Sequence, residues 1–395
     1  MSELSYLEKL LDGVKVEWKT LEDISIKISS GGTPKTGVSE FYDGDIPWLR
    51  TQEVNFCDIW DTEVKITESG VKNSSAKWIP KNCVIVAMYG ATVGKIGINK
   101  IPMTTNQACA NIQLNEEVAH YRYVFHFLCS QYTYIKSLGT GSQTNINAQI
   151  VKNIKIPIPC PDNPEKSLAI QSEIVRILDK FTELTAELTA ELTAELNMRK
   201  KQYNYYRDQL LNLEGRENTR EMRIGDIYDF QYGTGNTIPK SGGQYPVYGS
   251  NGIVGSHDKY NSEDSPVIGH IGAYAGIVNW GQGKHFVTYN GVICRHKSKE
   301  VLQKYAYYLL LLQDFGSKSN SASQPFVSYN ILNAPIVLVP PLQEQARIVA
   351  ILDKFDTLTN SITEGLPREI ELRQKQYEYY RDLLFNFPKP ETVSN

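Results

Sequence analysis

The sequence predicts a duplicated α+β protein, in which each of two globular halves is followed by a long helix. The run IVRILDKFTELT at 174–185 returns as IVAILDKFDTLT at 348–359. The run KQYNYYRDQLL at 201–211 returns as KQYEYYRDLLF at 375–385, at the same offset of 174 residues. The stretches between these repeats are rich in Gly, Tyr and β-branched residues, a composition typical of short strands and tight turns. A repeated α+β domain fits this pattern better than a parallel sheet.

The repeats divide the chain into five predicted segments: an N-terminal helix at 1–14, a first globular half at 15–160, a helix at 161–214, a second globular half at 215–340 and a distal helix at 341–395. Each globular half contains one further helical stretch, at 121–138 and at 299–315.

The two long helices share one apolar pattern. Its positions in the first helix step by 3, 4, 3 and 4, the spacing of a coiled-coil seam, and those of the second helix step identically. The two series are Ile174, Ile177, Phe181, Leu184 and Leu188, and Ile348, Ile351, Phe355, Leu358 and Ile362. Gly365 and Pro367 are predicted to bend or break the second helix.

The first long helix contains the tetrapeptide TAEL three times in succession, at 185–196. These residues favour a helix, and inserting four residues into a heptad pattern unwinds a coiled coil locally without breaking it. Two interpretations stay open. The insert is either a solvated extension of the helix or a ruler that sets the distance between the globular halves.

Composition and charge restrict the class of protein. The chain is 41% hydrophobic and 22% charged, as ordinary soluble proteins are, and has neither a long apolar run nor a signal peptide. We therefore expect a cytoplasmic protein. The six cysteines form no C-x-x-C pair and the six histidines no metal-ligand cluster, so neither disulfides nor a metal site are expected. The net charge of −3 is unusual for a free-standing DNA-binding domain.

Catalytic motifs are missing from the sequence. There is no phosphate-binding G-x-x-x-x-G-K-[ST] loop and no Asn/Asp-Pro-Pro-aromatic run. The segment 161–166 contains acidic residues without a separated E-x-K strand, and a turn or helix cap explains it better. The sequence therefore disfavours an enzyme acting alone.

Each globular half offers residues of the types that bind nucleic acids. Arg50 and Gln52 can read guanine and adenine edges, and polar loops can bond phosphates or bases. The alternative is structural: Trp48 would pack in the core, Arg50 would be a surface cation, and His270 would be a structural histidine. The candidate DNA-contacting residues are Lys35, Thr36, Trp48, Arg50, Gln52, Gln143 and Asn145 in the first half, and Lys240, Ser250, Asn251, Lys259, His270 and Lys284 in the second.

The helical motif Q-Y-x-Y-Y-R-D is retained in both repeats although the globular halves diverge. Tyr and Arg are enriched at the centres of protein interfaces. The predicted interface with a partner subunit comprises Tyr203, Tyr205, Arg207, Tyr377, Tyr379 and Arg381.

These helical runs, with SYLEKLLDG at 5–13, resemble the specificity subunits of Type I restriction–modification enzymes. The tandem TAEL repeats are similar to those of the IC subgroup. The resemblance implies two target-recognition domains in a pseudo-two-fold arrangement, separated by two long antiparallel coiled-coil helices. It also implies that each domain reads one part of an asymmetric, interrupted DNA site.

The same resemblance implies partners that carry out the chemistry. Two methyltransferase subunits would bind S-adenosylmethionine, restriction subunits would bind ATP and Mg²⁺, and this chain would bind no cofactor. The main alternative, favoured by the net charge, is a non-catalytic coiled-coil scaffold with two protein-binding heads.

Overall fold

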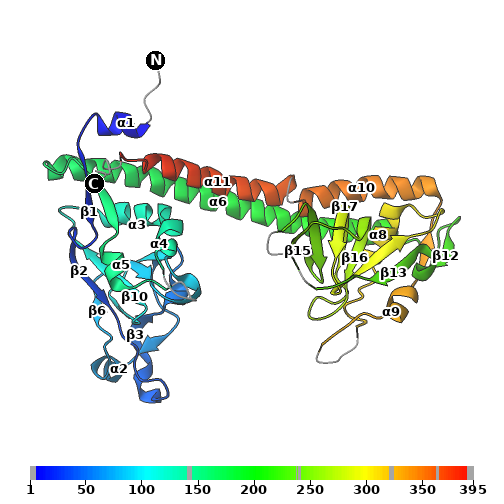
Figure 1. Cartoon of the computed structure of the whole chain (residues 1–395), viewed down its shortest axis with the longest axis horizontal. Coiled ribbons are helices and arrows are strands. Elements are labelled where there is room, and N and C mark those ends of the chain that lie inside the picture. Colours follow the sequence, from blue (N-terminus) through cyan, green and yellow to red (C-terminus); the bar gives the residue numbers. More distant parts are fainter. Residues whose placement is uncertain are drawn as a thin grey trace. The chain divides into compact units, whose positions relative to one another are not determined.

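The computed structural model describes residues 6–139, 145–236, 238, 242–319, 324–361 and 364–388. It contains two compact units (Figure 1): the first unit comprises Met1–Ala190 and Glu371–Asn395, and the second comprises Glu191–Ile370. Three long helices contribute to them: α6 (Pro164–Leu211), α10 (Leu342–Asn360) and α11 (Gly365–Leu384). Within the described ranges, none of the helices combines the length and apolar character needed to cross a membrane.

The first unit combines three sheets with short helices. Its sheets have the strand orders β2-β10-β7-β8-β4, β5-β3-β9-β6 and β1-β11. The side chains of β7 and β8 are all buried, and α3 packs against them. The elements are α1 (Tyr6–Leu11), β1 (Val16–Thr20), β2 (Ser25–Ser30), β3 (Tyr42–Leu49), β4 (Cys57–Ile59), β5 (Lys65–Ile66), α2 (Glu68–Lys72), β6 (Trp78–Ile79), β7 (Val84–Ala87), β8 (Ile96–Asn99), β9 (Met103–Thr105), β10 (Cys109–Leu114), α3 (Tyr121–Ser130), α4 (Tyr132–Ser137), α5 (Ala148–Lys152) and β11 (Lys155–Pro159).

The second unit has a six-stranded sheet of order β13-β18-β16-β17-β14-β15 and a two-stranded sheet β12-β19. Helix α8 packs between this sheet and α10. The elements are β12 (Arg220–Arg223), α7 (Ile224–Ile227), β13 (Tyr228–Tyr232), β14 (Tyr245–Gly249), β15 (Gly252–His257), β16 (Ser262–Gly269), β17 (Val278–Val287), β18 (Gly291–His296), α8 (Gln303–Leu311), α9 (Tyr329–Asn333) and β19 (Ile336–Val339).

The duplication extends into the globular parts, although their sequences have diverged. The antiparallel order β2-β10-β7-β8 in the first unit corresponds to β13-β18-β16-β17 in the second. The short helices α5 and α9 both begin at a residue whose side chain accepts a backbone hydrogen bond, Asn147 and Ser328. The predicted α+β class is confirmed.

The long helices repeat one aromatic contact. In the first unit, Phe181 of α6 stacks on Tyr380 of α11 with ring centroids 5.6 Å apart. In the second unit, Phe355 of α10 stacks on Tyr206 of α6 at 5.7 Å. Because Phe181 and Phe355 are repeat counterparts, as are Tyr206 and Tyr380, the two contacts are equivalent. The predicted break of the second helix also occurs, between Asn360 and Gly365.

The predicted apolar seam is wrong at two positions. Leu184 and Leu188 are 40% and 42% exposed. Instead, the Thr182 hydroxyl of α6 faces α11 and donates to Tyr377 Oη at 3.1 Å. After Phe181 the next partly buried positions of α6 are Thr185, Thr189 and Leu192, so the buried side of the helix follows these residues and not the two leucines.

Four histidines are partly or fully buried, and we expect the protein to be less stable to unfolding in mild acid because of them. Burial lowers the pKa of His120, His126, His285 and His296. Below about pH 6.5 the unfolded chain therefore binds protons that the folded chain resists, so the free energy of unfolding decreases as the pH falls. We expect a lower melting temperature at pH 5.5 than at pH 7.5 in calorimetry, and a shallower dependence for His126→Gln. An equal or higher melting temperature at pH 5.5 would contradict this.

Candidate nucleic-acid interface

Strand β3 of the first unit ends in the polar segment that the sequence singled out. Leu49 is fully buried and anchors the strand end, and Gln52 is exposed in the short 3₁₀ turn Thr51–Glu53 that follows. Between them, the Arg50 guanidinium lies 2.5 Å from Glu63 and 3.7 Å from Glu53. These carboxylates fix the direction of the Arg50 side chain, which keeps part of its surface open to solvent.

A glycine-bounded turn lies beside this segment. Gly90 and Gly94 both have φ of +80°, a conformation that other residues rarely adopt. Between them, Thr92 Oγ1 donates to the backbone oxygen of Thr51 at 2.9 Å. Asn145 Oδ1 accepts from Gly90 N at 3.4 Å. We call Arg50–Gln52, Gly90–Gly94 and Asn145 the first loop face.

Trp48 supports the loop after β2 from within the fold. Its side chain is 6% exposed, and its indole N–H donates to the backbone oxygen of Gly32 at 2.9 Å. Gly31 packs so closely on Thr105 that a Cβ atom there would overlap the backbone. Lys35 and Thr36, which follow in the same loop, are exposed.

The second unit builds an equivalent face. The parallel pair β14–β17 corresponds to the parallel pair β3–β9, so Ser250 and Asn251 after β14 correspond to Thr51 and Gln52 after β3. The turn between β16 and β17 repeats the glycines, with φ of +88° at Gly272 and +89° at Gly276. We call Ser250–Asn251 and His270–Gly276 the second loop face.

Within the second loop face, His270 supports the turn. It is 5% exposed, and its Nδ1 lies 3.1 Å from the backbone oxygen of Tyr289. Its ring stacks on Tyr232 with centroids 4.1 Å apart, and Tyr329 stacks on the other face of Tyr232 at 4.2 Å. Tyr274, in the middle of the turn, is 49% exposed.

The structure does not bring all candidates of the second unit together. Lys259 lies beyond the far end of the six-residue strand β15, about 20 Å from Asn251. Lys284 is exposed, and its Nζ lies 4.7 Å from the ring centroid of Tyr260. Lys284 therefore lies beside Tyr260, and neither cation belongs to the second loop face. Gln143 and Lys240 lie outside the described residues.

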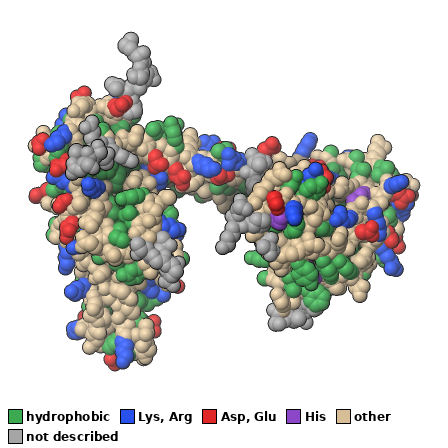
Figure 2. All heavy atoms as spheres, viewed as in Figure 1, with side chains coloured by type: hydrophobic (Ala, Val, Ile, Leu, Met, Phe, Trp, Pro, Cys, Tyr) green, Lys and Arg blue, Asp and Glu red, His purple; other side chains and the backbone are tan. Residues whose placement is uncertain are grey.

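The glycine-bounded turns were not among the sites predicted from the sequence. Their common pattern, G-A-x-x-G at 90–94 and 272–276, is visible in the sequence and places Thr92 and Tyr274 at equivalent positions. On the face drawn in Figure 2, Lys and Arg side chains alternate with Asp and Glu in each unit instead of forming one basic stripe. That face therefore presents no continuous basic track for a phosphate backbone.

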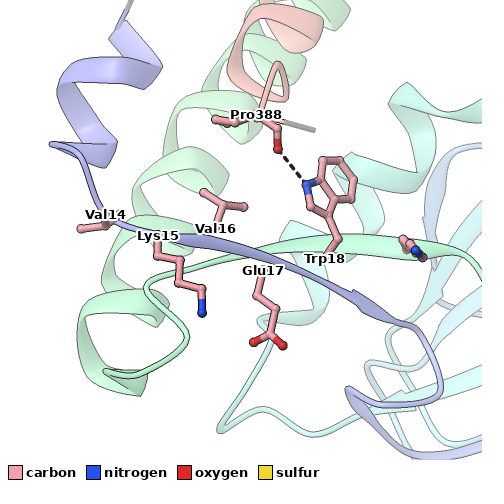
Figure 3. A pocket seen from close by; sticks show the side chains of 7 residues that line it. Val14, Lys15, Val16, Glu17, Trp18 and Pro388 are labelled. Carbon is pink, nitrogen blue, oxygen red and sulfur yellow. Dashed lines mark hydrogen bonds between the residues drawn. The ribbon is translucent and has the colours of Figure 1, made fainter. Parts of the chain in front are cut away.

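A hollow lies elsewhere, along β1. It measures about 510 Å³ and is lined by Val14, Lys15, Val16, Glu17, Trp18, Lys155 and Pro388. In Figure 3 the indole of Trp18 points toward Pro388, whose backbone oxygen accepts its N–H at 2.8 Å. None of the predicted DNA-contacting residues lines this hollow.

A family model described as "Type I restriction modification DNA specificity domain" matches residues 14–198 and 216–372. The chain belongs to this family. It is therefore the DNA specificity subunit of a Type I restriction–modification system, and in that role it is itself non-catalytic.

Relatives match the specificity subunit over its length. It is 39% identical to the EcoprrI specificity subunit of Escherichia coli, over 92% of this chain and 93% of that protein. It is 38% identical to the EcoR124I/EcoR124II specificity subunit of the same species, over the whole of both. A chain from a structure described as "Structural basis underlying complex assembly and conformational transition of the type I R-M system" has the same fold. Its TM-score is 0.64 at 17% identity, covering 94% of this chain and 97% of that one.

The helical motifs of the specificity subunit expose only part of the predicted partner interface. Tyr205 and Tyr379 are each 61% exposed, whereas Tyr203 is 6% exposed and packs near Phe355. Arg207 and Arg381 lie over the rings of Tyr203 and Tyr377, with 18% and 15% of their side chains exposed. In the described ranges, no group of three or more His, Cys, Asp or Glu side chains is placed to hold a metal ion.

Proposed function

We propose that this specificity subunit reads an asymmetric two-part DNA site, one part with each loop face, and directs methylation or restriction by partner subunits in the cytoplasm. One observation carries the proposal. The two loop faces follow equivalent strands in the two units, but they carry different side chains. Arg50 and Gln52 have Gly249 and Asn251 at their counterpart positions. Equivalent surfaces with unlike side chains suit two unlike base sequences.

We further propose that the reactions occur on partners. Two methyltransferase subunits would bind S-adenosylmethionine, and restriction subunits would bind ATP and Mg²⁺. Phosphate contacts from such partners would account for the net charge of −3. The tandem TAEL repeats support placement in the IC subgroup, and the segment boundaries at 15–160 and 215–340 remain our proposal for the recognition domains.

The test is a domain exchange. Residues 15–160 are replaced by the corresponding segment of a relative with a different target, the methyltransferase subunits are co-expressed, and genomic methylation is sequenced. We expect one part of the methylated site to change and the other to persist. A change in both parts would contradict separate reading. Equal binding of the wild-type complex to site-containing and random duplexes in a gel shift would favour the scaffold alternative.

Tyr205 and Tyr379 are expected to be hot spots for binding the methyltransferase subunits. Truncating a hot spot costs about 2 kcal/mol or more, which is about 30-fold in affinity, so Tyr205→Ala together with Tyr379→Ala should weaken assembly at least 30-fold. Analytical ultracentrifugation of the mixed subunits measures this. Tyr134→Ala is the matched control, because Tyr134 is 54% exposed but belongs to α4 and not to either of the repeated helical motifs. Equal assembly of the double variant and wild type would place the interface elsewhere.

A further inference from the structure

Each long-helix repeat holds its globular part through a buried glutamine. In the first unit, Gln171 Oε1 accepts from His120 N at 2.9 Å and its Nε2 donates to Val118 O at 3.0 Å. In the second unit, Gln345 Oε1 accepts from Leu302 N at 2.7 Å and its Nε2 donates to Glu300 O at 3.0 Å. Both glutamines are fully buried, and they are repeat counterparts. Each therefore binds the chain just before the helix, α3 or α8, that packs on the sheet.

An aspartate two turns further along makes the second attachment in the first unit. Asp179 accepts two hydrogen bonds from the Nε and Nη2 of Arg122 at 2.7–3.0 Å and contacts His126 Nε2 at 2.7 Å. Arg122 also binds both oxygens of Asp58, at 3.1 Å. Burial alone would raise the pKa of Asp179, but the hydrogen bonds from His126 and Arg122 hold that pKa at about 2. The carboxylate is thus charged and fixed at neutral pH.

The second unit makes the equivalent attachment with different chemistry. Asp353, the counterpart of Asp179, accepts a hydrogen bond from the Tyr308 hydroxyl at 2.5 Å. Tyr308 follows Leu302 by six residues, as His126 follows His120. The helix residue is therefore the same in both units, while its partners in the globular part are Arg122 and His126 in the first unit and Tyr308 in the second.

Two directional contacts on one helix restrict rotation in a way that apolar packing does not. The glutamine and the aspartate are eight residues apart, which is about 12 Å along a helix. Between them lie fully buried apolar residues, Ile174 and Leu178 in α6 and Ile348 and Leu352 in α10. Burial of these side chains is favourable but non-directional. The polar pair fixes the angle at which the globular part sits on its own helix segment.

We infer that Gln171 with Asp179, and Gln345 with Asp353, are positioning residues that set how each loop face is presented and thereby the spacer length accepted between the two parts of the site. This inference rests on the proposed function. Two properties of recognition are then separate. The loop faces determine the bases. The two joints, by which we mean the contacts of Gln171 with Asp179 and of Gln345 with Asp353 to their globular parts, determine the tolerated spacing. Loosening one joint relaxes the spacing and leaves the bases unchanged.

The test removes one hydrogen-bonding group at each joint, the Tyr308 hydroxyl or the His126 imidazole, in the full chain assembled with its methyltransferase subunits. The variants are Tyr308→Phe and His126→Ala, and methylation is measured on duplexes with the native spacer and with one base pair more or less. Loss of a hydrogen bond to a charged group is worth about a factor of ten or more, so we expect the preference for the native spacer to fall about tenfold. His126→Tyr, which imports the partner used in the second unit, should retain the preference.

The matched control is Tyr305→Phe. Tyr305 is buried in the same helix, and its hydroxyl has no hydrogen-bond partner among the described residues. Wild-type spacer preference in Tyr308→Phe, or equal relaxation in Tyr305→Phe, would overturn the inference.

A second measurement keeps the inference separate from the proposed function. Nitroxide labels at Asn55 and Arg176, both within the first unit, report the distance between a loop and its helix. His126→Ala should broaden the distance distribution and His126→Tyr should not, whether or not the wild-type complex methylates a two-part site. An unchanged distribution in His126→Ala would overturn the inference, whereas a wild-type complex without two-part specificity would reject only the proposed function.

Discussion

Deleting one TAEL repeat, residues 189–192, is expected to abolish methylation of the native site and to move it to a site whose spacer is one or at most two base pairs shorter. Four helical residues span about 6 Å, and base pairs stack about every 3.4 Å. Helix α6 runs without interruption from Pro164 to Leu211, so no loop within it absorbs the loss. The shift should lie at the low end, because only one of the two long helical segments is shortened.

The expected effect on activity depends on how many residues are deleted. Removing four residues rotates the following helix by only about 40°, whereas removing two rotates it by about 160° in the other direction. A deletion of residues 189–190 should therefore misdirect Tyr203 and Tyr206 and cause loss of activity on every spacer. Sequencing of genomic methylation distinguishes these outcomes. Full activity of the four-residue deletion on the original spacer would favour the solvated-extension interpretation.

Replacing Phe385 and Phe387 together by Ala should unfold the first unit under conditions in which wild type is folded. Both side chains are buried, 6% and 3% exposed, and both pack on Tyr123. Removing a buried Phe side chain costs about 3–5 kcal/mol, and two such losses rival the whole stability of a domain.

Chemical denaturation followed by circular dichroism measures this effect. The matched control is Leu383→Ala, because Leu383 lies in the last turn of α11, just before Phe385, but is 41% exposed, and its loss should cost under about 1 kcal/mol. A double variant as stable as Leu383→Ala would show that the C-terminal segment is dispensable to the first core.

The long helices were predictable from the sequence because their repeats are local. Helical periodicity and the conserved spacing of 174 residues identified both, and Gly365 indicated the break. Periodicity does not distinguish a seam facing a neighbouring helix from one facing solvent, and the exposed Leu184 and Leu188 illustrate this. Likewise, Tyr203 and Tyr205 look alike in the motif, but they point about 160° apart around the helix, and only Tyr205 is exposed.

The candidate site was predictable only in part, because it depends on strand pairing between distant residues. The equivalence of Arg50 with Gly249 follows from the parallel pairs β3–β9 and β14–β17, which no local pattern encodes. Trp48 and His270 have side chains suited to DNA, yet the fold uses them to support loops from beneath. Thr92 was overlooked because its turn resembles a strand in a run of alternating apolar residues and glycines.

The division of the first unit between the two ends of the chain has a consequence for synthesis on the ribosome. Its core includes Leu384, Phe385 and Phe387, whereas most of its other residues precede Ala190. The ribosome adds about 5–20 residues per second, so residues 191–370 take roughly 10–40 s to translate. During that interval the nascent first unit exposes the apolar surface around Tyr123 and Phe127 that the C-terminal residues later cover. The second unit, which is continuous in sequence, completes its core first, and the unit that is translated first depends longest on protection from aggregation.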